Sequence, residues 1–228
     1  MNLMNIKEKR DAGFTLLELL IVVSIIAILS VALVLVLDPA ETLRKSRDAQ
    51  RMSDLSTLKT AIGLYTTSTT TPYLGVSNSN TRCQANIGAV TTYVFYSIPS
   101  AISDTSLDGA GSGSTASTTA SANYTLTDGT GWIPVNFDSL IGGSPISNLP
   151  VDPVNTIGSA GDGSITNTTL AYRYACMITP LAYELGAVLE SETYTTGSDG
   201  KLTKDGGNSD YFYEVGTNLK ILGATNDY

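Results

Sequence analysis

The chain has 228 residues and a formal net charge of −8 at pH 7, with 13 Lys and Arg residues against 21 Asp and Glu residues. It contains no histidine and only two cysteines, so the commonest general base and the commonest zinc ligand are missing. No phosphate-binding glycine loop or nucleophile elbow is present, and the acidic balance argues against a nucleic-acid groove. We therefore expect a protein that is not an enzyme, needs no cofactor and binds no nucleic acid directly.

The first predicted element is a long apolar helix near the N-terminus. It opens with Gly13-Phe14-Thr15-Leu16-Leu17-Glu18 and continues to Leu37. As a helix with a rise of about 1.5 Å per residue, this run spans roughly 36 Å, enough to cross a hydrocarbon core of about 30 Å. Glu18 is the anomaly, because a carboxylate in lipid costs about 3 kcal/mol and no Lys or Arg lies within the run to pair with it.

The residues around this acid resemble a known signal. A leader with basic residues (Lys7, Lys9 and Arg10), then Gly13 and the sequence Phe-Thr-Leu-Leu-Glu before a long apolar helix, is similar to the type III signal of type IV pilins and type II secretion pseudopilins. The resemblance implies that a prepilin peptidase cuts after Gly13 and methylates the new amino terminus at Phe14. It also implies that Glu18 pairs with the terminal amine of a neighbouring subunit, so that the lone acid directs assembly.

The partners that the resemblance implies are further copies of the chain in a homo-oligomeric filament, the prepilin peptidase, an assembly platform with its motor proteins, and the membrane. The expected location is the cytoplasmic membrane, with one span and the head domain outside, and then an extracellular filament or the cell surface. Two other readings of the apolar run stay open: cleavage as an ordinary secretory signal near residues 30–32 or after Ala40, and an uncleaved anchor. An ordinary signal has only about 7–15 apolar residues before its cut, which makes this run too long for one.

The second predicted element is an amphipathic helix that follows a break at Asp38-Pro39, since proline removes a hydrogen bond and disfavours helix in the residue before it. Its apolar positions recur at spacings of three and four, and we expect them to pack on a sheet. They are Met52, Leu55, Leu58, Ile62 and Tyr65. Charged residues fall off this stripe: Arg51, Asp54 and Lys59.

The rest of the chain predicts five short strands, rich in aromatic and β-branched residues, at 92–98, 132–137, 170–177, 183–189 and 211–215. The expected fold class is α+β and pilin-like, with a long N-terminal helix packed on a small antiparallel sheet. The expected divisions are a leader at 1–13, a membrane and assembly segment at 14–37, an amphipathic segment at 38–66 and a globular head at 67–228. Within the head, the Ser-, Thr- and Gly-rich segment 103–131 is expected to be a variable surface loop.

The two cysteines, Cys83 and Cys176, are candidates for a disulfide in an extracytoplasmic domain, with buried free thiols as the alternative. Residues 149–155 contain two prolines and are expected to be extended or turning, in a way that resembles the proline-aspartate-proline loop of pseudopilins. Glu190 and Glu192 are expected to be two solvated acids on one face of a strand.

The C-terminal segment also looks like the calcium loop of major pseudopilins, with a plain turn-rich connection as the alternative. The residues to test there are Asp199, Asp205, Asn208 and Asp210.

We therefore predict the structural subunit of a type IV pilus-like filament. The alternatives are a pseudopilin of a secretion or DNA-uptake system and, from another class, a membrane-anchored extracellular binding module.

Overall fold

The structure is a computed structural model that describes residues 13–76, 78–87, 92–98, 114–117, 122–155, 168–197 and 199–222. By its internal contacts the chain divides into two units, Met1–Thr42 and Leu43–Tyr228. Of the first unit, residues 13–42 are described. The expected variable loop at 103–131 lies only partly within the described residues.

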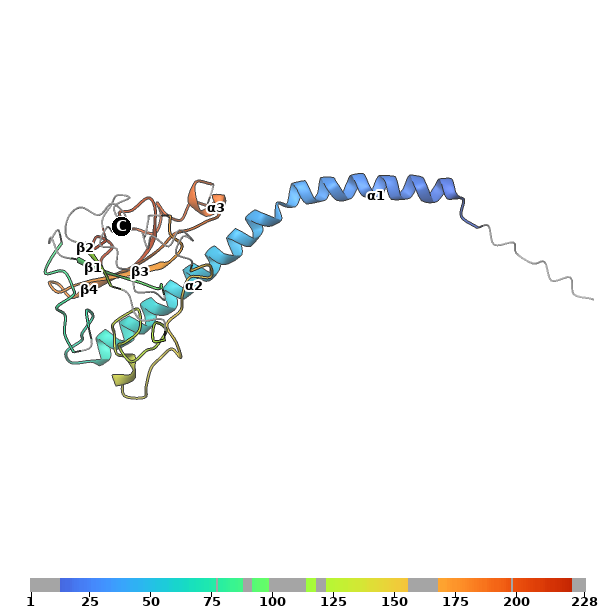
Figure 1. Ribbon diagram of the computed structural model, residues 1–228. Helices are drawn as coiled ribbons and strands as arrows, with labels where there is room; N and C mark the ends of the chain where they lie inside the picture. The colour runs from blue at the N-terminus through green and yellow to red at the C-terminus, as the bar shows by residue number, and fades with distance from the viewer. Residues whose placement is uncertain are drawn as a thin grey trace, which may run out of the picture. The chain divides into compact units, whose positions relative to one another are not determined.

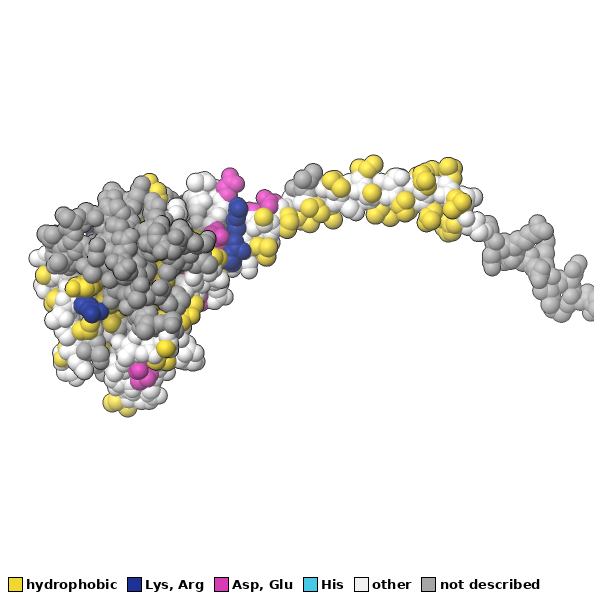
Figure 2. Space-filling model, in the orientation of Figure 1, with side chains coloured by type: hydrophobic (Ala, Val, Ile, Leu, Met, Phe, Trp, Pro, Cys, Tyr) yellow, Lys and Arg dark blue, Asp and Glu magenta, His cyan; other side chains and the backbone are white. Residues whose placement is uncertain are grey.

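The first unit consists of helix α1 (Leu16–Leu37) and the first turn of the next helix. The 22 residues of α1 are about 33 Å long at 1.5 Å per residue, and the helix passes the test for a membrane span by its length and composition. The apolar side chains of its described residues are exposed, and Figure 2 shows many of them along the visible face of the helix. A helix that is apolar all round needs lipid or other protein around it.

The break predicted at Asp38-Pro39 is confirmed. Asp38 has a left-handed backbone conformation with φ of 34°, and helix α2 (Pro39–Ser68) begins at the proline. Proline suits the first helical position because its missing N–H has no partner there in any case. The Asp38 carboxylate instead accepts a hydrogen bond from the Glu41 backbone N–H at 3.2 Å.

The second unit is a mainly antiparallel sheet with α2 packed along it (Figure 1). Its strands are β1 (Thr92–Tyr96), β2 (Ser114–Ser117), β3 (Tyr172–Met177), β4 (Ala182–Ala187) and β5 (Tyr213–Gly216), in the order β2-β1-β3-β4-β5. Strands β1, β3, β4 and β5 pair antiparallel, whereas β2 pairs parallel with β1. A short 3-10 helix, η1 (Phe137–Ser139), and a one-turn helix, α3 (Glu192–Thr195), complete the described elements.

Both faces of the central strands are buried. One face packs on α2, where Leu55, Leu58 and Ile62 are fully buried and each contributes roughly 1.5–3 kcal/mol. The tyrosines of this face also bond to the helix: the Tyr183 hydroxyl donates to the Lys59 carbonyl at 3.0 Å. The opposite face carries a second apolar cluster, formed by Val94, Tyr96, Ile98, Ala171, Ala175, Met177, Ala182, Ile221 and Leu222. The α+β class with a helix on an antiparallel sheet is thus confirmed.

Two expectations about strands differ from the structure. The prediction of a strand at 132–137 was wrong. Pro134 has no N–H to donate to a neighbouring strand. The backbone N–H groups of Trp132 and Phe137 donate to the loop carbonyls of Tyr124 and Thr127, respectively. These residues join the core without joining the sheet. Conversely, β2 lies within the segment expected to be a loop, where its small polar residues gave no strand signal.

Candidate functional site

The residues predicted to take part in processing and assembly lie at the start of α1. Gly13 and Phe14 precede the helix, and the Phe14 side chain is 88% exposed. Thr15 is the N-cap: its hydroxyl accepts from the Glu18 backbone N–H at 3.2 Å. In return, one oxygen of the Glu18 carboxylate accepts from both the backbone N–H and the hydroxyl of Thr15, each at 2.9 Å. This reciprocal capping box fixes the acid one turn from the predicted cleavage point.

Glu18 is the only ionisable group in α1. The other polar side chains of the helix, Ser24 and Ser30, donate to the carbonyls of Leu20 and Ile26, each at 2.7 Å, so their hydroxyls are satisfied within the helix. The capping box gives the Glu18 carboxylate hydrogen bonds but no opposite charge. Among the described residues, Glu18 is therefore the one negative partner that a cation would find at the start of α1.

A second set of charges lies inside the head and was missed from the sequence. Arg51 was expected to fall off the apolar stripe of α2, but its side chain is fully buried. Its guanidinium makes a two-bond pair with Asp152, at 2.6 and 2.9 Å, and also contacts Asp48 at 2.8 Å and Glu190 at 2.7 Å. We call Arg47, Asp48, Arg51, Asp152 and Glu190 the arginine cluster.

The arginine cluster joins three segments of the chain. Asp152, in the extended segment 149–155, also accepts from the backbone N–H groups of Val154 and Asn155. Asp48 accepts from the backbone N–H groups of Glu190 and Ser191 just after β4. The cluster thus fixes two loops against α2, using bidentate and charge-assisted bonds that are stronger than neutral ones.

The pKa values within the cluster follow these contacts. Hydrogen bonds from Arg47, and further those from Arg51, hold the pKa of Glu190 below its ordinary value, although partial burial acts in the opposite direction. Burial alone would lower the pKa of Arg51, but its carboxylate partners, Asp152 first, raise it overall. The expectation that Glu190 is a solvated strand residue was wrong: it follows β4, is half-buried and bonds to both arginines, whereas Glu192 is exposed in α3.

A pair of buried carboxyls lies on the face of the sheet opposite α2. One Glu184 oxygen accepts from the backbone N–H groups of Ile221 and Leu222, each at 2.8 Å, and one Glu214 oxygen accepts from that of Ser209 at 2.9 Å. The remaining oxygen of each has no donor among the described residues. Burial, and then the neighbouring Glu214, raise the pKa of Glu184 well above its ordinary value, which favours the protonated form of this carboxyl.

The four residues considered for calcium have separate contacts. Asp199 forms an ion pair with Lys201 at 2.9 Å, and Asp205 accepts from the backbone N–H groups of Gly207 and Glu214. The Oδ1 of Asn208 is buried without a partner, and Asp210 is exposed. Among the described residues, no group of three or more Cys, Asp or Glu side chains is placed to hold a metal ion. Calcium binding by these four residues therefore stays a prediction, and calcium has no part in the function proposed below.

The structure joins Cys83 and Cys176 in a disulfide, with 4.6 Å between their Cα atoms. Cys176 lies in β3 and is fully buried, and Cys83 lies in the chain that follows α2. The neighbouring Gln84 pairs with the end of β3: its N–H donates to the Cys176 carbonyl at 2.8 Å. The bridge therefore closes a segment that is also hydrogen-bonded to the sheet.

The comparisons with known proteins agree with the N-terminal signal. Residues 9–34 match the family model for the prokaryotic N-terminal methylation motif. The match supports a prepilin-type signal, consistent with type IV pilins and pseudopilins, and points to a structural subunit rather than an enzyme. Together with the exposed apolar helix, it indicates membrane anchoring. No curated protein and no solved structure was found to match the chain.

Proposed function

We propose that this chain is the structural subunit of a type IV pilus-like filament, stored in the membrane through α1, cut after Gly13 and polymerised through its N-terminal helix. The observation that carries the proposal is the position of Glu18, a lone acid held at the start of an otherwise apolar helix and within the methylation motif. Cleavage creates a free, cationic amine at Phe14, and in a filament the amine of one subunit would pair with the Glu18 carboxylate of its neighbour. Pairing the two between subunits removes the cost of a lone charge in an apolar surround.

The head in this proposal is a passive, stable body. Its buried Arg51 is paired within the arginine cluster, and its fold is closed by a disulfide, as suits an extracytoplasmic location. A pseudopilin of a secretion or DNA-uptake system would share the processing and the fold, and would differ in being scarce and short-lived. A tethered binding module would keep residues 1–13 and would tolerate changes at Glu18.

The first test is to shear filaments from cells that express the chain and to measure the amino terminus and intact mass by mass spectrometry. The proposal expects a chain that begins at methylated Phe14 in the filament fraction. Recovery from membranes alone, with residues 1–13 attached, would overturn the proposal in favour of the tethered module.

The second test separates the charge of Glu18 from its capping role. Glu18→Gln keeps an acceptor for the Thr15 N–H but has no charge, and Thr15→Val removes the hydroxyl cap but keeps the charge. We expect both variants to insert in the membrane, with filaments lost in Glu18→Gln and retained in Thr15→Val. Undiminished filaments from Glu18→Gln would refute the charge pairing.

A further inference from the structure

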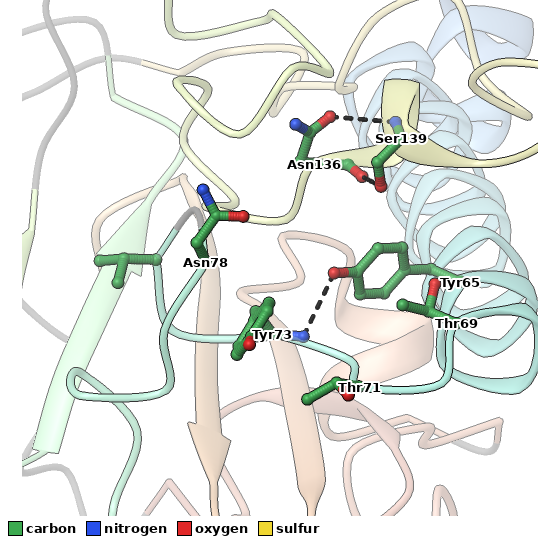
Figure 3. Close-up of a pocket in the computed structure, with 8 residues that line it drawn as sticks. Tyr65, Thr69, Thr71, Tyr73, Asn78, Asn136 and Ser139 are labelled. Atoms are coloured by element: carbon green, nitrogen blue, oxygen red, sulfur yellow. Dashed lines mark hydrogen bonds between the residues drawn. The ribbon is translucent and has the colours of Figure 1, made fainter.

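A pocket of about 240 Å³ opens beside the C-terminal end of α2 (Figure 3). Tyr65 lies near the end of the helix, and Thr71 and Tyr73 lie in the chain that leaves it. Asn136 and Ser139 face them from the two ends of η1. Figure 3 shows the side chains of these segments arranged around a common space, with the Tyr65 ring pointing into it.

Much of the hydrogen-bonding capacity of this pocket is unused. The Tyr65 hydroxyl accepts from the Tyr73 backbone N–H at 3.2 Å, so its own proton remains available to a ligand. The side chain of Asn136 forms one hydrogen bond, in which its Oδ1 accepts from the Ser139 backbone N–H at 3.2 Å, and its NH₂ group remains available to a ligand. Neither the Tyr73 hydroxyl nor the Asn78 amide has a hydrogen bond to the described part of the chain.

Asn78 is held in an uncommon backbone conformation, with φ of 67°. The left-handed region is unusual for residues other than glycine, although asparagine tolerates it better than most. Its exposed amide lines the pocket. The amide is thus held at the edge of the pocket while making no bond that stabilises the fold.

The chemistry of the lining selects a class of ligand. Every lining side chain is uncharged: Tyr65, Thr69, Thr71, Tyr73, Val76, Asn78, Asn136 and Ser139. An anion would find no cation and a metal ion no carboxylate, whereas a purely apolar ligand would leave the hydroxyls and amides without partners. A neutral polyol supplies both donors and acceptors, and the tyrosine rings offer apolar surface to its C–H groups.

We propose that this pocket binds one pyranose ring of a neutral carbohydrate. Its volume lies below the range of roughly 300–1,000 Å³ that is usual for drug-sized ligands, which suits a single ring. A second hollow of about 510 Å³ is lined in part by Leu64, Leu140 and Ile141 and shares Thr69 and Ser139 with the pocket. It leaves room for further sugar units of the carbohydrate beyond the bound ring. The inference goes beyond the proposed filament function, because binding requires neither cleavage after Gly13 nor assembly.

The test is saturation-transfer NMR on the full chain in lauryldimethylamine oxide micelles, since detergents with sugar headgroups would compete. The probes are D-glucose, D-galactose and their N-acetylamino derivatives, with glucuronic acid as the anionic comparison. We expect transfer to at least one neutral sugar and weaker transfer to glucuronic acid. No transfer to any neutral sugar at 20 mM, or transfer to glucuronic acid alone, would overturn the proposal.

Variants show whether the signal comes from the pocket. Asn78→Gly removes the amide while suiting the left-handed backbone, and Tyr73→Phe removes one hydroxyl. Each should weaken binding about 2- to 12-fold, the effect of one neutral hydrogen bond. The matched control is Thr57→Val, an exposed position on α2 outside the pocket whose hydroxyl donates to the Ser53 carbonyl. Circular dichroism verifies the fold of each variant, and equal binding by all three would overturn the assignment.

Discussion

Asp152→Asn should be among the most destabilising single-atom changes in the head. Asp152 makes two bonds of 2.6 and 2.9 Å to Arg51, and both side chains have no exposed surface. In the variant, Oδ1 still accepts a bond, but an NH₂ group meets the Arg51 Nε–H, so a donor faces a donor. For charge centres about 4 Å apart at an effective dielectric constant of about 20, the lost attraction is about 4 kcal/mol, in line with about 3–5 kcal/mol for breaking a buried pair.

That loss corresponds to a fall of roughly 6–20 °C in melting temperature for a domain of this size. The assay is thermal unfolding of the full chain in micelles, followed by the fluorescence of Trp132, the one tryptophan of the chain. Its indole N–H donates to the Pro150 carbonyl at 3.0 Å, so it reports on the same loop as Asp152. The matched control is Asp199→Asn, which breaks an exposed pair with Lys201 and should change the melting temperature little.

Combining Asp152→Asn with Arg51→Met gives the sharper test, because the effect of Asp152→Asn on the free energy of unfolding should then change sign. In an Arg51→Met background, Asp152 is a buried carboxylate without its cation, and Asp152→Asn should then stabilise the head. If Asp152→Asn costs no more than Asp199→Asn, or costs the same with and without Arg51, the reasoning about the arginine cluster is refuted.

Three further predictions concern the rest of the head. Because the pKa of Glu184 is raised by folding, this carboxyl binds more protons in the folded state than in the unfolded state. The free energy of unfolding of the wild type should therefore fall as pH rises above about 4.5, by up to ~1.4 kcal/mol per pH unit, until the pKa of folded Glu184 is passed. Glu184→Gln should therefore melt higher than wild type at pH 8 and show a flatter pH profile, and parallel profiles would contradict the raised pKa of Glu184. Reduction of the disulfide, which spans 93 positions, should lower the urea midpoint by the equivalent of about 4–5 kcal/mol in the simplest loop-entropy model; no change on reduction would reject that role. Tyr172→Phe, which removes a 2.7 Å bond to Asp54, should cost about 1 kcal/mol by denaturant titration, and a loss above about 3 kcal/mol would indicate a wider role.

The sequence was sufficient where a local pattern decides the outcome. The apolar run, the break at Asp38-Pro39 and the helical stripe of α2 depend on residues close together in the chain, and the structure has all three. Strands β1, β3, β4 and β5 also lie within or close to the predicted runs. The segment 132–137 has the same composition as a strand but no neighbour in the sheet, and pairing between distant segments is not encoded in local composition.

The arginine cluster could not be predicted either, because it joins residues that lie far apart in the sequence. Charge next to an apolar stripe usually indicates a solvated face, and the position of Arg51 on α2 gave no sign that Asp152 and Glu190 would reach it from 101 and 139 positions away. One partial signal was available. Asp48 and Arg51 are three residues apart and so share a face of the helix, and Asp152 lies between two prolines that fix its loop.

The two sets of charges differ in what they leave available to other molecules. Around Arg51 every carboxylate has a cationic partner within the head, and removing one partner is costly, so this cluster has a structural use inside the subunit. Glu18 has hydrogen bonds from Thr15 but no cationic partner in the part of the chain that the structure describes, and the sequence of its helix contains no Lys or Arg. A charge that is already paired gains little from another subunit, whereas a lone charge in an apolar surface gains the full pairing energy on assembly. The filament proposal therefore depends on Glu18, and changes in the arginine cluster should affect assembly only as far as they unfold the head.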